Sequence, residues 1–221
     1  MSLRKQQGFT LIEIAIVLVI IGLLLGGILQ GQSLINSARV RNLISQMDGV
    51  KAAFYGFQDR YRALPGDISD VTVIPGASTP GNGNGQIEAG KESVAVWDHL
   101  SHAGFITGAY TGGPAVDGTG TTPTNPWGAY IQLIYDKVYD PSATATLRHN
   151  LKTGNQVPVE VIAEVDRKID DGNALGGIMR FSAYASTNST APAAADCYVA
   201  ATGVWNAAST GQTNCGAAIL F

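Results

Sequence analysis

The stretch Phe9–Leu29, FTLIEIAIVLVIIGLLLGGIL, decides how the rest of the chain is interpreted. Its only ionisable residue is Glu13. About 20 consecutive apolar residues are enough to cross the hydrocarbon core of a bilayer, so the stretch predicts a transmembrane helix. Arg4 and Lys5 precede it, and positive charge favours the cytoplasmic side of a membrane. The sequence therefore predicts a cytoplasmic N-terminus, with everything after Leu29 outside.

A secretory signal peptide explains this stretch poorly, because the apolar region is too long and no small-x-small cleavage site follows it. A plain membrane anchor is the alternative, but it leaves Glu13 without a reason. A carboxylate in lipid costs at least about 2.5 kcal/mol on insertion scales, and such groups usually have a partner. We therefore expect a specific role for Glu13.

The composition agrees with membrane association. Only 14% of the 221 residues are charged, where about a quarter is usual, and the formal net charge is −3. There is no long basic run, so by default we expect no nucleic-acid partner. The length suits one domain with an appendage.

The two cysteines, Cys197 and Cys215, both lie near the C-terminus. Cysteines usually stay reduced in the cytosol, whereas beyond a membrane they can pair and close a loop. An even count with no leftover thiol favours pairing. We expect a structural disulfide that contributes about 3 kcal/mol by the chain-entropy model.

A short motif gives Glu13 a partner. The residues Gly8-Phe9-Thr10-Leu11-Ile12-Glu13, behind a basic leader and ahead of an apolar run, resemble the type III signal of type IV prepilins and type II secretion pseudopilins. The resemblance implies that a prepilin peptidase/methyltransferase cuts between Gly8 and Phe9 and methylates the new amine of Phe9. It also implies that Glu13 neutralises the Phe9 amine of a neighbouring subunit during filament assembly.

The resemblance implies a structural subunit and no enzyme: a pilin, minor pilin or pseudopilin of a type IV pilus or type II secretion-like filament. The expected partners are the peptidase, other pilin or pseudopilin subunits, and an inner-membrane assembly platform with its ATPase. The expected location is a single pass through the inner membrane with a periplasmic head, then a cell-surface or periplasmic filament. Two alternatives stay open, namely a tip-located minor pilin that acts as an adhesin or DNA-binding module, and a signal-anchored extracytoplasmic binding domain.

A helical pattern continues beyond the apolar stretch to about Arg62. Apolar residues recur at steps of three and four, which places them on one helical face: Val40, Leu43, Met47, Val50, Phe54, Phe57 and Tyr61. We expect this face to pack on a globular domain. The alternative is a coiled-coil seam, which about three heptads support only weakly.

We therefore divide the chain into four parts. Residues 1–8 are the leader that the peptidase removes, and 9–29 form the transmembrane and filament-core helix. Residues 30–63 form an amphipathic helix that continues into the head, and 64–221 form the extracytoplasmic α+β head. Leu64-Pro65-Gly66-Asp67 ends the long helix, because proline restricts its predecessor and glycine permits a turn.

The predicted fold class is α+β and pilin-like, with the long helix packed on a small antiparallel sheet. Two helices are expected in the head, Glu92–Ala103 and Pro158–Asp171. Four strands are expected by their β-branched and aromatic content: Tyr130–Tyr135, Leu147–Leu151, Ile178–Ala185 and Gly216–Phe221. The stretch from Ile169 to Gly172, followed by Gly176-Gly177-Ile178, also resembles a helix-to-strand junction that recurs in some pilin-like proteins.

We expect no cofactor, with calcium as a minor alternative. Asn82 and Asn84 alternate with glycines as in a calcium loop, and Glu88 lies nearby. Pro80 and Lys91, however, occupy the first and last ligand positions, where carboxylates belong. The residues therefore predict a plain turn, with Asn82, Asn84 and Glu88 as weak candidate ligands.

Two further groups could bind a metal ion. His99 and His102 are three residues apart on a predicted helix, but no other Cys or His lies nearby in sequence, so we expect a solvated or capping role. Asp170 and Asp171 could be a ligand pair, although acids at helix ends are usually solvated.

Overall fold

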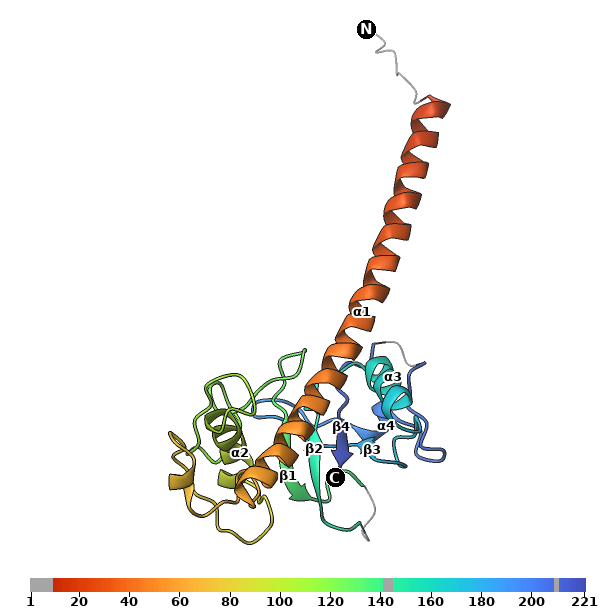
Figure 1. The fold of residues 1–221 in the computed structure, drawn as a ribbon. Helices are drawn as coiled ribbons and strands as arrows, with labels where there is room; N and C mark the ends of the chain where they lie inside the picture. The colour runs from red at the N-terminus through yellow and green to blue at the C-terminus, as the bar shows by residue number, and fades with distance from the viewer. Residues whose placement is uncertain (1–9, 141–144, 209–210) are drawn as a thin grey trace, which may run out of the picture. The chain divides into compact units, whose positions relative to one another are not determined.

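The structure is a computed structural model that describes residues 10–140, 145–208 and 211–221 (Figure 1). It divides into two compact units, of which one ends at Ala38 and the other covers Arg39–Phe221. One long helix, α1 (Leu11–Tyr61), runs through both units. The long N-terminal helix expected from the sequence is thus confirmed.

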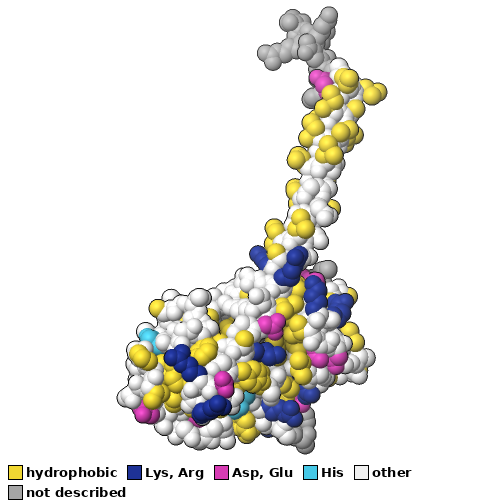
Figure 2. Space-filling view, viewed as in Figure 1, with side chains coloured by type: hydrophobic (Ala, Val, Ile, Leu, Met, Phe, Trp, Pro, Cys, Tyr) yellow, Lys and Arg dark blue, Asp and Glu magenta, His cyan; other side chains and the backbone are white. Residues whose placement is uncertain are grey.

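The first unit contains the apolar part of α1. An 18-residue window in this helix has a mean hydropathy of 2.9 and no buried residue, so the helix is long and apolar enough to cross a membrane. Figure 2 shows hydrophobic side chains along this part of the helix. Leu11 and Ile12 are 88% and 66% exposed. Such an apolar surface requires lipid or another protein to cover it.

The second unit begins with the amphipathic part of α1. The buried residues of α1 all come from this part and share one face: Val40, Leu43, Met47, Val50, Ala53, Phe54 and Phe57. They belong to the main hydrophobic core, with Tyr61 half-buried against it. The predicted periodic face therefore packs on the head, as expected.

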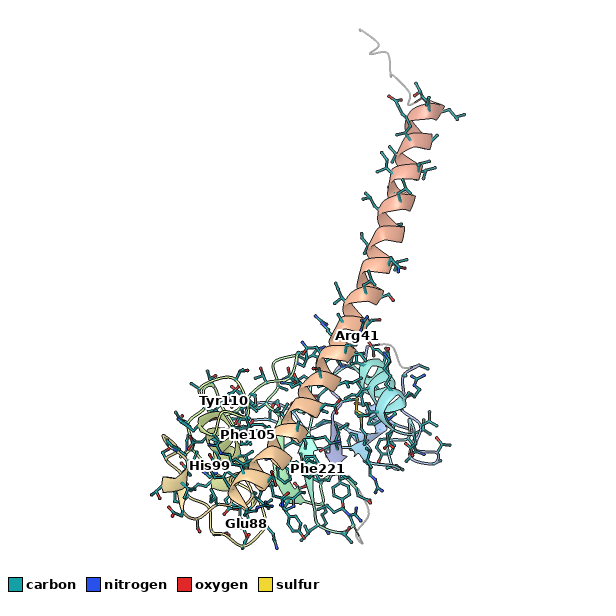
Figure 3. The ribbon with its side chains drawn as sticks, in the orientation of Figure 1. Arg41, Glu88, His99, Phe105, Tyr110 and Phe221 are labelled. Atoms are coloured by element: carbon teal, nitrogen blue, oxygen red, sulfur yellow. A yellow bond between two sulfur atoms is a disulfide. The ribbon has the colours of Figure 1, made fainter. Side chains whose placement is uncertain are left out.

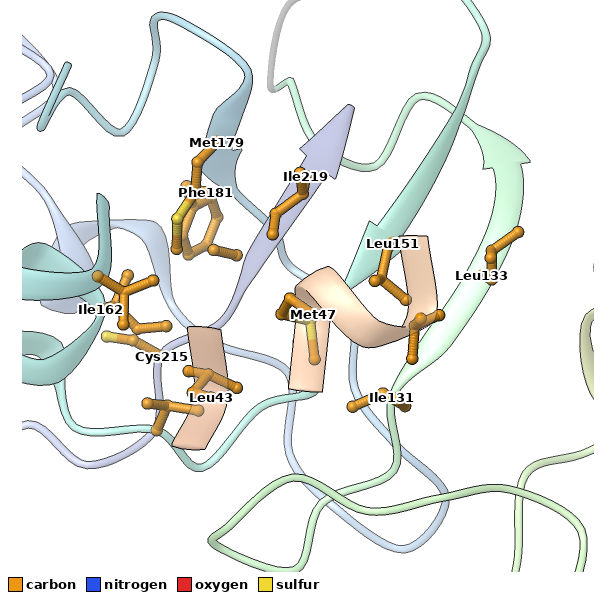
Figure 4. Packing of buried hydrophobic residues seen from close by; sticks show 14 of the residues in the cluster. Leu43, Met47, Ile131, Leu133, Leu151, Ile162, Met179, Phe181, Cys215 and Ile219 are labelled. Carbon is orange, nitrogen blue, oxygen red and sulfur yellow. The ribbon is translucent and has the colours of Figure 1, made fainter. Parts of the chain in front are cut away.

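A four-stranded antiparallel sheet lies under this helix face. Its order is β1 (Gln132–Asp136), β2 (Arg148–Lys152), β4 (Ala217–Leu220) and β3 (Met179–Phe181). The register aligns a row of apolar residues across the four strands: Leu133, Leu151, Ile219 and Met179. All four are buried, and Figure 4 shows them on the side of the sheet where Leu43 and Met47 of α1 lie.

Two helices flank the amphipathic part of α1 on opposite sides, α2 (Lys91–His102) and α3 (Val159–Ile169) (Figure 1). Both were expected. Helix α3 also carries an i,i+4 ion pair, with Lys168 Nζ 2.8 Å from Glu164 Oε1. The sequence did not predict two short elements, the 3-10 helix η1 (Val71–Val73) and the helix α4 (Ala194–Cys197).

Strand β3 is shorter than the predicted Ile178–Ala185. Its ladder with β4 covers only Met179–Phe181, opposite Ile219 to Ala217. One more backbone hydrogen bond follows, from the Ser182 N–H to the Gly216 carbonyl at 3.0 Å.

The expected disulfide is present between Cys197 and Cys215, whose Cα atoms are 5.7 Å apart. Both cysteines are buried in the core. Cys197 ends α4, and Cys215 forms an isolated antiparallel bridge with Val157 just before α3. The disulfide thus fixes α4 to the segment that leads into β4.

The other face of the sheet carries a buried ion pair. Lys152 of β2 has a side chain that is only 2% exposed, and its ammonium contacts the carboxylate of Asp136 at the end of β1. The ammonium also donates to Gln132 Oε1 at 3.0 Å and lies 5.2 Å from the centre of the Tyr184 ring. Burial lowers the pKa of Lys152, and the charge of Asp136 opposes that shift.

Candidate functional site

The first candidate site is the start of α1. Gly8 and Phe9, where cleavage and methylation are expected, lie outside the described residues. Thr10 is described, and both its backbone N–H and its hydroxyl donate to Glu13 Oε2 at 2.7 Å. The Glu13 N–H donates back to the Thr10 hydroxyl oxygen at 3.3 Å. This reciprocal pattern is a capping box, which satisfies free N–H groups at a helix start.

The capping box gives Glu13 a partner within its own chain. The signal for it in the sequence is Thr-x-x-Glu at residues 10–13, a pattern typical of a capping box. Glu13 therefore has a local structural role that must be separated from any role between subunits.

The second candidate is the histidine pair of α2, for which a solvated or capping role was expected; His102 is exposed, but His99 is not solvated. His99, which Figure 3 labels, is fully buried, and both its ring nitrogens have hydrogen-bond partners. Nδ1 accepts from the Gly66 N–H at 2.8 Å, and Nε2 lies 2.7 Å from the Thr79 carbonyl. Because Nδ1 is an acceptor, Nε2 carries the proton and donates to Thr79. His102 pairs instead with Asp98, at 2.7 Å from Nδ1 to Oδ1.

His99 therefore holds the turn that ends α1. Gly66 in this turn has φ of +88°, and a Cβ there would lie 2.5 Å from the carbonyl oxygen of Glu92. Only glycine fits these constraints comfortably. The sequence-based interpretation failed because Gly66 and Thr79, the two partners of His99, lie 33 and 20 residues away along the chain.

The buried state of His99 predicts acid sensitivity. Burial lowers its pKa below the ordinary 6.5, while the Thr79 hydrogen bond and the Asp98 charge oppose this and His102 adds to it. The unfolded chain therefore takes up a proton first as the pH falls below 6.5, and the head loses stability. Because His99 binds only one proton, it can change the free energy of unfolding by at most about 1.4 kcal/mol per pH unit. Denaturant unfolding of the full chain in detergent between pH 8 and pH 5 measures it.

The control for this prediction is His99→Gln, which removes the titratable group and keeps an amide that can donate and accept. The variant should show a smaller loss of stability between pH 7 and pH 5 than the unmodified chain. Burial also lowers the pKa of His149, so a residual slope is expected. An unchanged slope in His99→Gln would contradict the assignment.

The third candidate is the loop with Asn82, Asn84 and Glu88. Its carboxylates already have partners. Both Glu88 oxygens accept from the side-chain amides of Asn82 and Asn84, at 3.3 and 2.9 Å (Figure 3 labels Glu88). Glu92 accepts from the N–H groups of Asn82 and Glu88, at 2.9 Å in each case.

Asp67 completes the arrangement of this loop. Its two carboxylate oxygens accept from the N–H groups of Asn84 and Gly85 at 3.0 and 2.9 Å. The carboxylates of Asp67, Glu88 and Glu92 thus fix the loop by hydrogen bonds, as a bound cation does in a calcium loop. The charged acceptors are used internally, and this geometry favours the plain turn.

The fourth candidate joins Asp170 and Asp171 with Asp166, which the sequence did not single out. One carboxylate oxygen from each lies within 4.8 Å of the others. Burial raises the pKa of Asp166. The hydrogen bond from the Trp205 indole and the nearby Gly172 N–H lower it, and the charges of Asp170 and Asp171 raise it further. Asp166 lies four residues before Asp170. This i,i+4 spacing in the sequence could have indicated that the two carboxylates lie on the same side of the helix.

Comparison with known proteins concerns the first candidate site. Residues 3–29 match the prokaryotic N-terminal methylation motif. No curated protein and no solved structure matches the chain. The match covers the apolar segment with Glu13 and the expected processing position before Phe9. This motif is the signature of type IV pilins and pseudopilins, and the long apolar helix with its small antiparallel sheet forms an α+β, pilin-like architecture.

Proposed function

We propose that the chain is a structural subunit of a type IV pilus or of a type II secretion-like filament. It is made as a membrane precursor, cut between Gly8 and Phe9, methylated on Phe9, and then packed with other subunits through the apolar part of α1. The observation that carries this proposal is the methylation motif at residues 3–29, which includes the apolar, exposed first part of α1.

The exposed apolar surface supports assembly as well as anchoring. Apolar area gains about 25 cal/mol per Å² when it leaves water, so this part of α1 is stable only in lipid or against other apolar helices. Lipid is a favourable environment for the apolar side chains but not for Glu13, because its charged carboxylate is costly there without a counter-charge. A bundle of identical helices supplies both an apolar environment and a cationic amine.

Cleavage of the leader is required for two reasons in this mechanism. Removal of residues 1–8 creates the amine of Phe9 that pairs with Glu13, and it removes Arg4 and Lys5. An uncompensated charge in an apolar bundle is strongly unfavourable. A subunit with an uncut leader therefore has no place in the filament core.

The partners follow from this role. The chain is a substrate of a prepilin peptidase/methyltransferase, a neighbour of other pilin or pseudopilin subunits, and cargo of an inner-membrane platform driven by an ATPase. The orientation places residues 1–8 in the cytoplasm and the head in the periplasm. We assign no catalytic role to the chain, because proteins with this motif are structural subunits.

The intact mass of the mature protein tests the processing steps. We expect a chain of residues 9–221 that is one methyl group heavier, and two hydrogens lighter because of the Cys197–Cys215 disulfide. Gly8→Val, which places a bulky side chain at the cut, should keep residues 1–8 and stay in the membrane fraction. A mature chain that begins at Met1 would overturn the proposal.

A further inference from the structure

Two Asn-Gly pairs follow each other in the loop between η1 and α2, namely Asn82-Gly83 and Asn84-Gly85. Asparagine is a thermolabile residue, and a following glycine leaves the side-chain amide open to attack because it has no Cβ to keep its backbone nitrogen away. All four residues are exposed, so water reaches both pairs. The pairs match in residue type and in exposure, so their contacts determine how their reactivity differs.

The side-chain amide of each asparagine is held in the same way. Asn82 Oδ1 accepts from the Asn84 N–H at 2.9 Å, and Asn84 Oδ1 accepts from the Gln86 N–H at 2.8 Å. The Nδ2 groups of both asparagines donate to Glu88, at 3.3 and 2.9 Å. In each pair an N–H therefore lies at the oxygen on which negative charge develops when the amide carbon is attacked, and this contact lowers the barrier.

The nitrogen that would attack has a different partner in each pair. The Gly83 N–H donates to the backbone carbonyl of Asp67 at 2.8 Å, and a carbonyl is a very weak base. The Gly85 N–H donates to the carboxylate of Asp67, at 2.9 Å to Oδ2. Asp67 is only 4% exposed, and its Oδ1 accepts from the Asn84 N–H at 3.0 Å, so the carboxylate is fixed against the second pair. The second pair thus has a general base at its attacking nitrogen, where the first pair has a carbonyl.

We propose that Asn84 deamidates by self-catalysis, with Asp67 as the general base. Asp67 Oδ2 takes the proton of the Gly85 N–H, and the electron pair of that nitrogen forms a bond to Asn84 Cγ. The negative charge that develops on Asn84 Oδ1 is held by the Gln86 N–H. The bond from Cγ to Nδ2 then breaks, the proton passes from Asp67 to the departing nitrogen through solvent, and ammonia leaves.

The product is a five-membered succinimide that joins Asn84 Cγ to the Gly85 nitrogen. Water then opens one of its two bonds to that nitrogen. One opening leaves aspartate at position 84, and the other leaves isoaspartate, in which the main chain continues through the side-chain carboxyl carbon. The net reaction consumes one water and releases one ammonia, so it needs no other reactant.

The new carboxylate would change the loop. Asn84 Nδ2 donates to Glu88 Oε1 at 2.9 Å, and after the reaction two carboxylates would face each other at this contact. Like charges at this distance repel, so the loop would lose a hydrogen bond and each chain would gain one negative charge. The inference is independent of the proposed function, because it depends only on residues of the second unit.

Isotope labelling of the full chain tests the proposal. The protein is purified in detergent and incubated at neutral pH in ¹⁸O-labelled water, which marks each aspartate or isoaspartate that forms. The tryptic peptide of residues 63–91 contains both pairs and no internal lysine or arginine, so mass-spectrometric fragmentation compares Asn82 and Asn84 in one molecule. We expect Asn84 to react at least about tenfold faster than Asn82 in the folded chain, since a general base typically contributes about 10²–10⁴-fold. In denaturant the two rates should become similar.

Asp67→Asn should slow the reaction of Asn84 at least about tenfold. The variant removes the carboxylate base but keeps an oxygen that can accept from the Gly85 N–H. Loosening of the loop would change the rates of Asn82 and Asn84 together, whereas loss of the base changes only that of Asn84.

Glu92→Gln is the matched control. Glu92 fixes the same loop through the N–H groups of Asn82 and Glu88, so its replacement perturbs the loop and leaves Asp67 in place. The rate of Asn84 relative to Asn82 should not change. The proposal is overturned by equal rates of Asn82 and Asn84 in the folded chain, by absence of label at Asn84 when the unfolded chain is labelled, or by an unchanged rate in Asp67→Asn.

Discussion

Glu13→Gln is expected to abolish incorporation of the chain into filaments, while membrane insertion and removal of residues 1–8 continue. Glutamine removes the charge that would pair with the Phe9 amine of a neighbour. It can still serve at the third position of a capping box, so the start of α1 is preserved. The Phe9 amine would then enter an apolar bundle without a counter-charge, which is strongly unfavourable. We expect at least a tenfold decrease of the chain in sheared filaments relative to the membrane fraction.

Thr10→Ala is the matched control for this experiment. It removes the hydroxyl that donates to Glu13 Oε2 at 2.7 Å and accepts from the Glu13 N–H, but it keeps the carboxylate. If charge pairing between subunits drives assembly, Thr10→Ala should be incorporated to at least half the normal level. A loss in Thr10→Ala equal to that in Glu13→Gln would show that the helix cap, rather than the charge, is required.

The same experiment separates the filament subunit from a signal-anchored binding domain. An anchored domain needs α1 only as a span, so Glu13→Gln should improve or preserve its insertion and leave its activity intact. Normal incorporation of Glu13→Gln would count against the assembly role. The effect of Glu13→Gln therefore distinguishes a filament subunit from an anchored binding domain.

The elements that the sequence predicted well are those with a strong local pattern. The 3.6-residue period of α1 continues for many turns, so both the helix and its buried face could be predicted. The strands were predicted from their β-branched and aromatic content, but the register that aligns Leu133 with Leu151, Ile219 and Met179 was not. The end of β3 was not predicted, since it is set by the extent of the ladder with β4, whose last pair joins Phe181 and Ala217 far apart in sequence.

The polar interior was predicted poorly, because its partners are far apart in sequence. His99 meets Gly66 and Thr79, and Asp166 meets Trp205, which is 39 residues away. Nothing in the sequence around His99 or Asp166 indicates burial. The capping box of Thr10 and Glu13, in contrast, is a local signal that could be read directly.

Asp136→Asn should be the most damaging conservative substitution in the head. The Lys152 ammonium is almost fully buried and contacts the Asp136 carboxylate, which also accepts from Asn150 Nδ2 at 2.9 Å. Removing one partner of a buried pair leaves an uncompensated charge and typically costs about 3–5 kcal/mol. We expect a loss of this size in the free energy of unfolding, measured with denaturant on the full chain in detergent.

The pH dependence identifies the cause of that loss. Burial already lowers the pKa of Lys152 below its ordinary 10.5, and without Asp136 the neutral amine is favoured further. The unfolded chain then binds a proton that the folded chain does not, so Asp136→Asn should lose more stability as the pH falls below 10.5. The double variant with Lys152→Met carries no buried charge, and it should recover most of the lost stability because apolar replacement of a buried pair is often neutral. Equal losses in the single and double variants would mean that the pair matters through shape alone, and that the charge of Lys152 is not what Asp136 stabilises.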